Sequence, residues 1–193
     1  MKNEVCSAKP QATARRGGAD FVIQRDRAVV AREVHVLEVA GSIPAPATNQ
    51  IRTVMRDITK IIVHCSDTPE GRDDKAEDIR RWHTKERGWK DIGYHYVIDL
   101  DGTIEPGRDI SIVGAHCTGH NADSIGICYV GGKTKDMKKV KDTRTDAQKA
   151  SMLLLLKFLV AKYPKAKIYG HRDFAEKACP SFDAKTEYET LCG

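Results

Sequence analysis

The sequence predicts an α/β (α+β) domain in which a central mixed β-sheet is flanked by helices. Three observations lead to this expectation. Short runs rich in β-branched residues alternate with longer segments of helical periodicity. The dipeptide Asp101-Gly102, a hairpin turn signal, separates two of the strand-like runs. Residues 145–163 open with a capping-box pattern and repeat their leucines at helical spacing.

The first half of this domain should be a strand, a helix and a hairpin. Residues 58–64 form a strand that is apolar on both faces, which indicates a place inside the sheet. A helix is expected over residues 73–87, with Gly88 as its C-cap. Residues 93–100 and 103–105 then pair as antiparallel strands around the turn.

The second half should add two strands and the longest helix. A third long strand is expected over residues 124–131, followed by a charged loop. The helix over 145–163 stops before Pro164, and residues 166–169 form the last strand. The resulting order is β-α-β-β-loop-β-α-β. The helix should be buried along Met152, Leu155, Leu156, Leu159 and Val160.

Residues 1–54 differ from the remainder of the chain. They fit neither helical nor strand periodicity, and residues 41–48 have the composition of a linker. We expect the functional domain to comprise residues 55–193. The first 54 residues are then a disordered extension or the product of an over-long start-site assignment.

Composition excludes several classes of function. The chain has 40% hydrophobic and 31% charged residues, as soluble globular proteins do, and its net charge of +5 is too small to indicate nucleic-acid binding. No apolar run is long enough to insert into a membrane. The first residues lack a secretory signal, so we expect synthesis in the cytoplasm and reduced thiols for the six cysteines.

The residues with the clearest chemistry lie at strand ends and in one loop. His171 follows the last strand, and Lys177 and Cys179 follow within a few residues; the lysine favours a thiolate. His64 ends the first strand, where Cys65 points to the opposite side and is expected to pack in the core. Taken singly, each histidine is more often a core or surface residue than a ligand. Ligands drawn from separate elements, in a chain without C-x-x-C pairs, are nevertheless typical of a catalytic zinc site with one open position.

A collinear series of motifs resembles the phage-type zinc N-acetylmuramoyl-L-alanine amidases (type 2 amidases), whose fold is shared by the animal peptidoglycan recognition proteins. The resemblance covers about residues 55–183. Its motifs are His64-Cys65-Ser66-Asp67-Thr68, Arg80-Arg81-Trp82-His83 with Gly88-Trp89, Ile92-Gly93-Tyr94-His95-Tyr96, Asp101-Gly102-Thr103-Ile104-Glu105-Pro106-Gly107-Arg108, Gly114-Ala115-His116, Ser124-Ile125-Gly126-Ile127 and Lys177-Ala178-Cys179-Pro180-Ser181-Phe182-Asp183.

The resemblance implies a site and a reaction. One Zn²⁺ would be held by His64, His171 and Cys179, and Tyr94 and Lys177 would be needed for activity. The reaction is hydrolysis of the amide between N-acetylmuramic acid and L-alanine in peptidoglycan, on the cell wall after release. Which of Tyr94 and Lys177 transfers the proton to the leaving nitrogen stays open.

His116 lies in a loop that should border the cleft, so we expect it to bind substrate or support a zinc ligand, although a structural role is nearly as common. Two other functions are compatible with the same fold. One is a peptidoglycan-binding protein without catalysis, against which the presence of Cys179, Tyr94 and Lys177 argues. The other is a regulator that binds phage RNA polymerase through its N-terminal region, a role that the long extension argues against.

Overall fold

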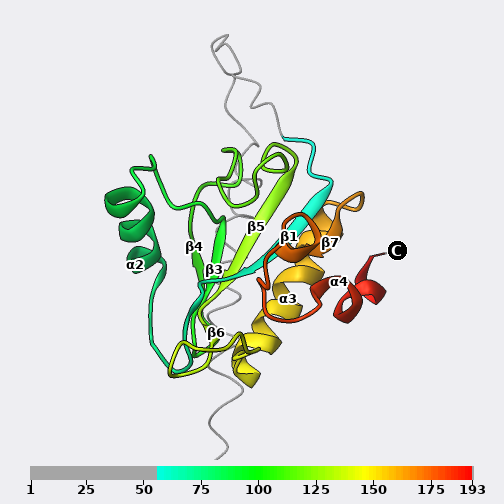
Figure 1. Cartoon of the computed structure of the whole chain (residues 1–193). Helices are drawn as coiled ribbons and strands as arrows, with labels where there is room; N and C mark the ends of the chain where they lie inside the picture. The colour runs from blue at the N-terminus through cyan, green and yellow to red at the C-terminus, as the bar shows by residue number, and fades with distance from the viewer. Residues whose placement is uncertain (1–55, 193) are drawn as a thin grey trace, which may run out of the picture. The chain divides into compact units, whose positions relative to one another are not determined.

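The computed structural model describes residues 56–192, so the expectation for residues 1–54 lies outside the described part of the chain. A five-stranded sheet in the order β4-β3-β5-β1-β7 forms the centre of the domain (Figure 1). The elements are β1 Lys60–Cys65, β2 Thr68–Pro69, α2 Ala76–Arg81, the π-helix Trp82–Glu86, β3 Tyr96–Ile98, β4 Ile104–Pro106, β5 Ser124–Tyr129, β6 Gly132–Lys133, α3 Asp146–Lys162, β7 Lys167–Gly170, the 3₁₀ turns His171–Asp173 and Glu189–Leu191, and α4 Ala184–Glu187.

The sheet is mixed, as the sequence predicts. Strand β1 pairs in parallel with β5 on one side and with β7 on the other, which confirms its place inside the sheet. Strand β3 is parallel to β5 and antiparallel to β4, which follows it through the turn at Asp101-Gly102. Because β1, β3, β5 and β7 all run the same way, their carboxyl ends meet at one edge.

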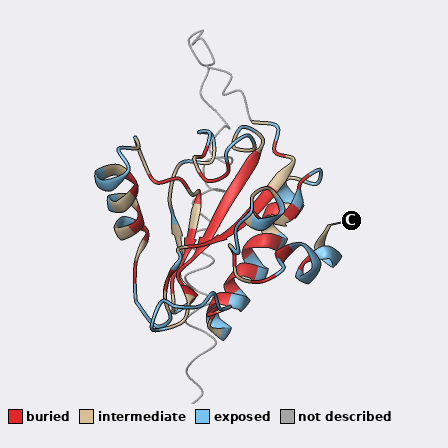
Figure 2. Cartoon of the chain, viewed as in Figure 1, coloured by how far each residue is buried: buried red, intermediate tan, exposed pale blue. Residues whose placement is uncertain are grey.

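Helix α3 covers one face of the sheet and forms the larger core (Figures 1 and 2). Its N-cap is Thr145, whose hydroxyl accepts the backbone N–H of Gln148, and the Gln148 side chain accepts the N–H of Thr145 in return. The predicted face is buried except Val160, which is partly exposed at the edge of the core. Against it pack the odd-numbered apolar residues of the inner strands: Ile61, Val63, Ile125, Ile127 and Tyr129.

Helix α2 packs on the other face over a smaller apolar cluster that includes Ile79, Val97 and Cys128. Its C-terminal continuation is a π-helix rather than the regular helix that the sequence predicts. Gly88 ends it with φ of +69°, as expected of a C-cap. This face is covered only in part, and it is the face to which His64 belongs, since His64 is the register partner of Cys128.

Two segments differ from the sequence-based expectation. The second strand is limited to Tyr96–Ile98 because the carbonyls of Gly93 and Tyr94 accept hydrogen bonds from the loop residues Ala115 and Arg108 instead of a strand. The charged loop after β5 contains strand β6, which pairs with β2 in a second, two-stranded sheet.

Five cysteines lie in the described residues, and none of these five is paired in a disulfide. Within residues 56–192, no helix has the length and apolar character needed to cross a bilayer.

Candidate active site

Two of the candidate ligands are neighbours because of strand register. In the parallel pair β1–β7, Val63 lies opposite Gly170. The residue that follows Val63 and the residue that follows Gly170 are both histidines. His64 and His171 therefore meet at the carboxyl edge of the sheet. Their ring centroids are 4.6 Å apart. The approach of these two histidines therefore follows from pairing two short parallel strands in this register.

The third ligand candidate, Cys179, is brought back to this edge by the loop after β7. The Cys179 carbonyl accepts the backbone N–H of Arg172 at 2.8 Å, which closes the loop. The next carbonyl, that of Pro180, accepts the buried Tyr129 hydroxyl at 2.8 Å. Tyr129 belongs to β5, so the loop is fixed to the core below it.

The donor atoms of His64, His171 and Cys179 all lie within 4.8 Å of one another. Nδ1 of His64 lies 3.8 Å from Sγ of Cys179. Two imidazoles and one thiol are a donor set typical of zinc, and three protein ligands leave a coordination position open. The backbone N–H of Cys65 also points at Cys179 Sγ, at 3.3 Å, as amide donors do toward metal-bound thiolates.

The two histidines are held neutral, which is the form that binds a metal. Burial lowers the pKa of His64 well below its usual value, and the nearby His116, His171 and Lys177 lower it further. Burial and the Lys177 ammonium also lower the pKa of His171. The neighbouring Cys65 thiol and burial raise the pKa of Cys179 in the metal-free protein. A divalent cation reverses this effect, because it stabilises the thiolate directly.

Behind His64 lies a chain of polar contacts through His116. Nε2 of His64 is 3.1 Å from Nδ1 of His116, and Nε2 of His116 is 3.3 Å from the Ser124 hydroxyl. That hydroxyl donates to the carbonyl of His120 at 2.6 Å. Gly126 leaves room for the His116 ring, since a Cβ there would lie 2.5 Å from the His116 Cδ2 atom.

Tyr94 and Lys177 line the same cleft as the ligand candidates His171 and Cys179. The Tyr94 ring centroid is 5.1 Å from that of His64. Burial raises the pKa of Tyr94 well above 10, and the surrounding cysteines Cys128, Cys179 and Cys65 add to the effect. The phenol is therefore a hydrogen-bond donor at neutral pH. Lys177 is exposed, on the loop between His171 and Cys179.

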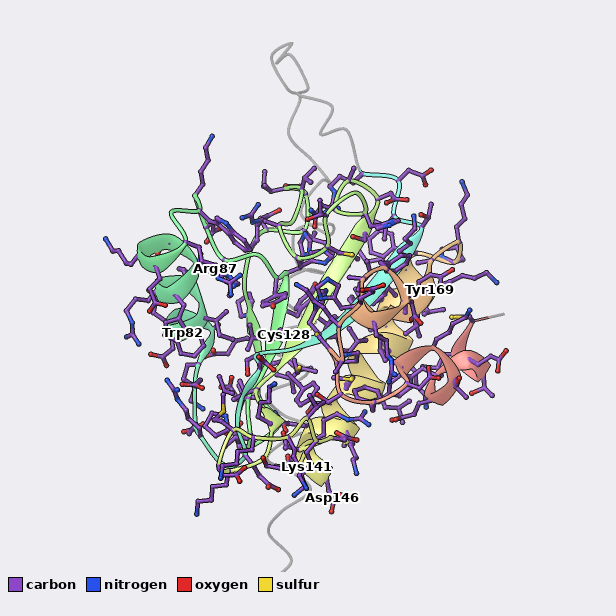
Figure 3. All side chains as sticks on the ribbon, in the orientation of Figure 1. Trp82, Arg87, Cys128, Lys141, Asp146 and Tyr169 are labelled. Atoms are coloured by element: carbon purple, nitrogen blue, oxygen red, sulfur yellow. The ribbon has the colours of Figure 1, made fainter. Side chains whose placement is uncertain are left out.

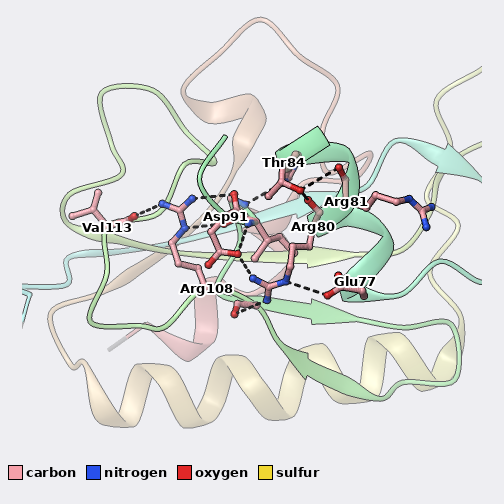
Figure 4. Close-up of polar contacts among 11 residues, drawn as sticks. Glu77, Arg80, Arg81, Thr84, Asp91, Arg108 and Val113 are labelled. Atoms are coloured by element: carbon pink, nitrogen blue, oxygen red, sulfur yellow. Dashed lines mark hydrogen bonds and ion pairs between the residues drawn. The ribbon is translucent and has the colours of Figure 1, made fainter. Parts of the chain in front are cut away.

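The cleft has a volume of about 800 Å³. Its lining includes Trp82 and Arg87 at the helical segment (Figure 3) and Cys117 and Thr118 in the loop after Gly114. Two arginine networks attach the helical segment to the domain (Figure 4). They are Arg80 with Glu77, Asp91 and the Gly107 carbonyl, and Arg108 with the carbonyls of Asp91, Ile92 and Val113.

Sequence reasoning gave no role to His83, which also lines the cleft. Its Nδ1 accepts the backbone N–H of Gly93 at 3.0 Å, and its ring stacks near Trp89. The sequence signal that points to a role for His83 is its position next to Trp82 in the helical motif. His95 and Cys128 are packing residues: His95 is buried and accepts the N–H of Gly126, and Cys128 belongs to the smaller core.

Comparison with known proteins places this geometry in context. The profile of the family described as N-acetylmuramoyl-L-alanine amidase matches residues 54–182. The endolysin of Escherichia phage T7 is 48% identical over 129 residues, which cover 67% of this chain and 84% of the endolysin.

Two solved structures agree with the fold. The N-acetylmuramoyl-L-alanine amidase LysC from Clostridium intestinale URNW superposes with a TM-score of 0.58 at 31% identity, over 70% of this chain and 85% of LysC. Drosophila PGRP-LB superposes with a TM-score of 0.59 at 28% identity, over 70% of this chain and 82% of PGRP-LB.

Proposed function

The chain belongs to the N-acetylmuramoyl-L-alanine amidase family, and we propose that one Zn²⁺ held by His64, His171 and Cys179 serves its hydrolysis of peptidoglycan. The bond cleaved is the amide between N-acetylmuramic acid and L-alanine. The observation that carries the zinc proposal is the convergence of three donor atoms within 4.8 Å at an open cleft. Bound there, the ion would supply Lewis-acid activation of the amide carbonyl and of a water molecule.

Tyr94 is proposed to stabilise the oxyanion that forms when the amide carbonyl is attacked. Its raised pKa keeps the phenol protonated, so it can donate a hydrogen bond as negative charge develops on the oxygen. A donor held in place by burial needs little reorganisation during the reaction.

Lys177 is proposed to supply the second positive charge at the cleft. Its ammonium lies close enough to lower the pKa of both His64 and His171, so its field reaches the reacting atoms. The same field stabilises the oxyanion. Either Lys177 or Tyr94 can donate the proton that the leaving L-alanine nitrogen requires.

His116 is proposed to support the metal ligand His64 rather than to bind substrate. If Nδ1 of His64 binds the metal, its Nε2 carries the proton and donates to Nδ1 of His116. Nε2 of His116 is then protonated and donates to the Ser124 oxygen. That oxygen can accept, because its own proton goes to the His120 carbonyl.

Among the alternatives, a non-catalytic peptidoglycan-binding protein would not need a donor set, a phenol and an ammonium on one cleft. Polymerase binding through the N-terminal region concerns residues outside the described part, and no described contact favours it. We place the action of the protein on the cell wall, where its substrate lies, after release from the cell that makes it; the similarity to phage endolysins supports this.

The test is release of new L-alanine amino groups from purified peptidoglycan, with zinc content measured on the same samples. We expect activity in the wild type, loss of activity and zinc in Cys179→Ala, and loss of activity alone in Lys177→Ala. Cys192→Ala, a half-buried cysteine away from the cleft, is the matched control and should behave as wild type. Full activity in Cys179→Ala would refute the proposed site.

A further inference from the structure

Residues 132–141 form a short hairpin that borders the cleft, here called the cationic arm. The backbone N–H of Thr134 donates to the carbonyl of Lys139 at 2.9 Å, and Lys133 and Val140 form an antiparallel bridge. The arm therefore has a defined shape rather than that of an open loop. Lys133 and Val140 both line the cleft, together with the ligand candidates His171 and Cys179.

The root of the arm is fixed against the candidate metal centre. The Gly132 carbonyl accepts the Ser181 hydroxyl at 3.1 Å, two residues after Cys179, and the Gly132 N–H donates to the Thr143 hydroxyl at 2.8 Å. Gly132 has φ of +111°, and a Cβ there would lie 2.6 Å from the Cys65 sulfur. Only glycine fits this approach, so the position of the arm is coupled to that of the site.

The arm is strongly positive. It holds five lysines and one aspartate in a chain whose net charge is +5. Two of the lysines are paired across the second sheet, Lys133 with Asp67 at 3.4 Å and Lys141 with Glu70 at 2.8 Å. Figure 3 shows Lys141 on this part of the surface. The remaining three are exposed and form no ion pair with any residue of the described chain: Lys135, Lys138 and Lys139.

The substrate supplies the complementary charge. Each stem of peptidoglycan is a peptide, and an uncrosslinked stem ends in a carboxylate, so the polymer carries negative charge at regular intervals. While one stem occupies the cleft, its neighbours along the polymer remain outside. Lys135, Lys138 and Lys139 belong to the same hairpin as Lys133 and Val140, which line the cleft, so an adjacent stem can reach them. Their field favours an anionic partner over a neutral one.

We propose that the cationic arm binds the carboxylates of stem peptides adjacent to the one being cleaved, which makes the protein prefer polymeric peptidoglycan to soluble fragments. This inference rests on the proposed function, because it takes peptidoglycan as the substrate. Exposed ion pairs each change an equilibrium constant by no more than about fivefold. Three of them together should raise affinity for the polymer by roughly tenfold and make it sensitive to salt.

The experiment compares the variant Lys135→Gln/Lys138→Gln/Lys139→Gln with the wild type. Binding is measured by co-sedimentation with insoluble sacculi between low and high NaCl. Amide hydrolysis is measured on sacculi and on a soluble N-acetylmuramoyl-peptide. We expect about a tenfold loss of affinity for sacculi, a flatter salt dependence, and an unchanged kcat/KM on the soluble substrate.

The matched control removes the same charge away from the cleft, as Lys157→Gln/Lys165→Gln/Lys167→Gln, and should bind sacculi as the wild type does. Equal losses in the control and the arm variant would overturn the proposal, because net charge alone would explain them. Wild-type binding by the arm variant, or arm-dependent binding to vesicles of anionic phospholipid but not to sacculi, would also overturn it. An inactive wild type would refute the proposed function, whereas co-sedimentation would still decide the role of the arm.

Discussion

Nε2 of His64 lies 3.1 Å from Nδ1 of His116, and this contact turns the other nitrogen of His64 toward Cys179. A histidine thus stands where many zinc sites have a carboxylate or a carbonyl behind the ligand. A neutral acceptor orients the His64 ring without adding negative charge to the site. The His116 pKa, lowered to about 3 mainly by burial, keeps that acceptor neutral at physiological pH.

Removing this acceptor should weaken zinc binding. We expect His116→Ala to lower zinc affinity by about 10- to 100-fold, because Nε2–H of His64 loses its partner and the ring its fixed orientation. In His116→Asn the amide oxygen can occupy the place of Nδ1 and should recover part of the affinity. Zinc competition with a chelator measures both. Equal affinities in His116→Ala and the wild type would mean that His116 has no supporting role.

Loss of the Tyr94 hydroxyl should affect the reaction and not the metal. We expect Tyr94→Phe to lower kcat by about 10²- to 10³-fold, since a buried donor to the oxyanion is removed while the ring still packs near His64. Amine release under saturating substrate measures the change, and zinc content should equal that of wild type. Tyr169→Phe, on β7 and outside the cleft, is the matched control. A Tyr94→Phe enzyme with normal kcat would exclude this role.

The folded state should lose stability in mild acid. Burial lowers the pKa of His83 and His95 to about 4 and that of His116 to about 3. The unfolded chain therefore binds these protons first, so stability is complete above pH of about 6.5 and falls as the pH drops toward the folded-state values. Asp99 acts the other way between pH of about 4 and 6, because burial raises its pKa to about 6, and burial also raises the pKa of Asp74. These two carboxyls are outnumbered, because the pKa values of His64 and His171 are lowered as well.

Urea unfolding of the chelator-treated protein at a series of pH values measures this effect, without a contribution from bound metal. Each histidine should contribute on the order of 2 kcal/mol between pH 7 and pH 4. His95→Asn keeps an acceptor for the Gly126 N–H and should flatten the slope, because one of the buried histidines with a lowered pKa no longer titrates. A free energy of unfolding that does not change over this range would contradict the assignment.

Much of this site can be predicted from the sequence because it depends on strand order. His64 follows the β-branched run Ile61–Val63, His171 follows the short strand 167–170, and parallel neighbours place these two positions side by side. Cys179 is close to His171 along the chain, so its return to the same edge needs only a tight loop.

The parts that the sequence does not reveal depend on tertiary contacts between distant segments. His116 reaches His64 because Gly126, on another strand, leaves the space. The side chain of Cys65 points into the core, but its backbone N–H still contributes to the site. The sequence indicates only a charged loop where the cationic arm lies. The β2–β6 pairing and the Gly132 contacts, which the structure adds, fix its place beside the cleft.

Removal of zinc should abolish hydrolysis and leave the fold in place. The large core between α3 and the sheet contains none of the three proposed ligand side chains as a central member. His64 lies on the opposite face of the sheet with Cys128, and Cys179 lies only at the edge of that core. Chelation should therefore preserve the far-UV circular dichroism spectrum. It should lower Tm, because an ion that binds only the folded state adds RT ln(1 + [L]/Kd) to its stability. As the control, Cys179→Ala should have the same Tm with and without added zinc. Loss of secondary structure in the chelated wild type would contradict the prediction and show that the metal is needed for folding.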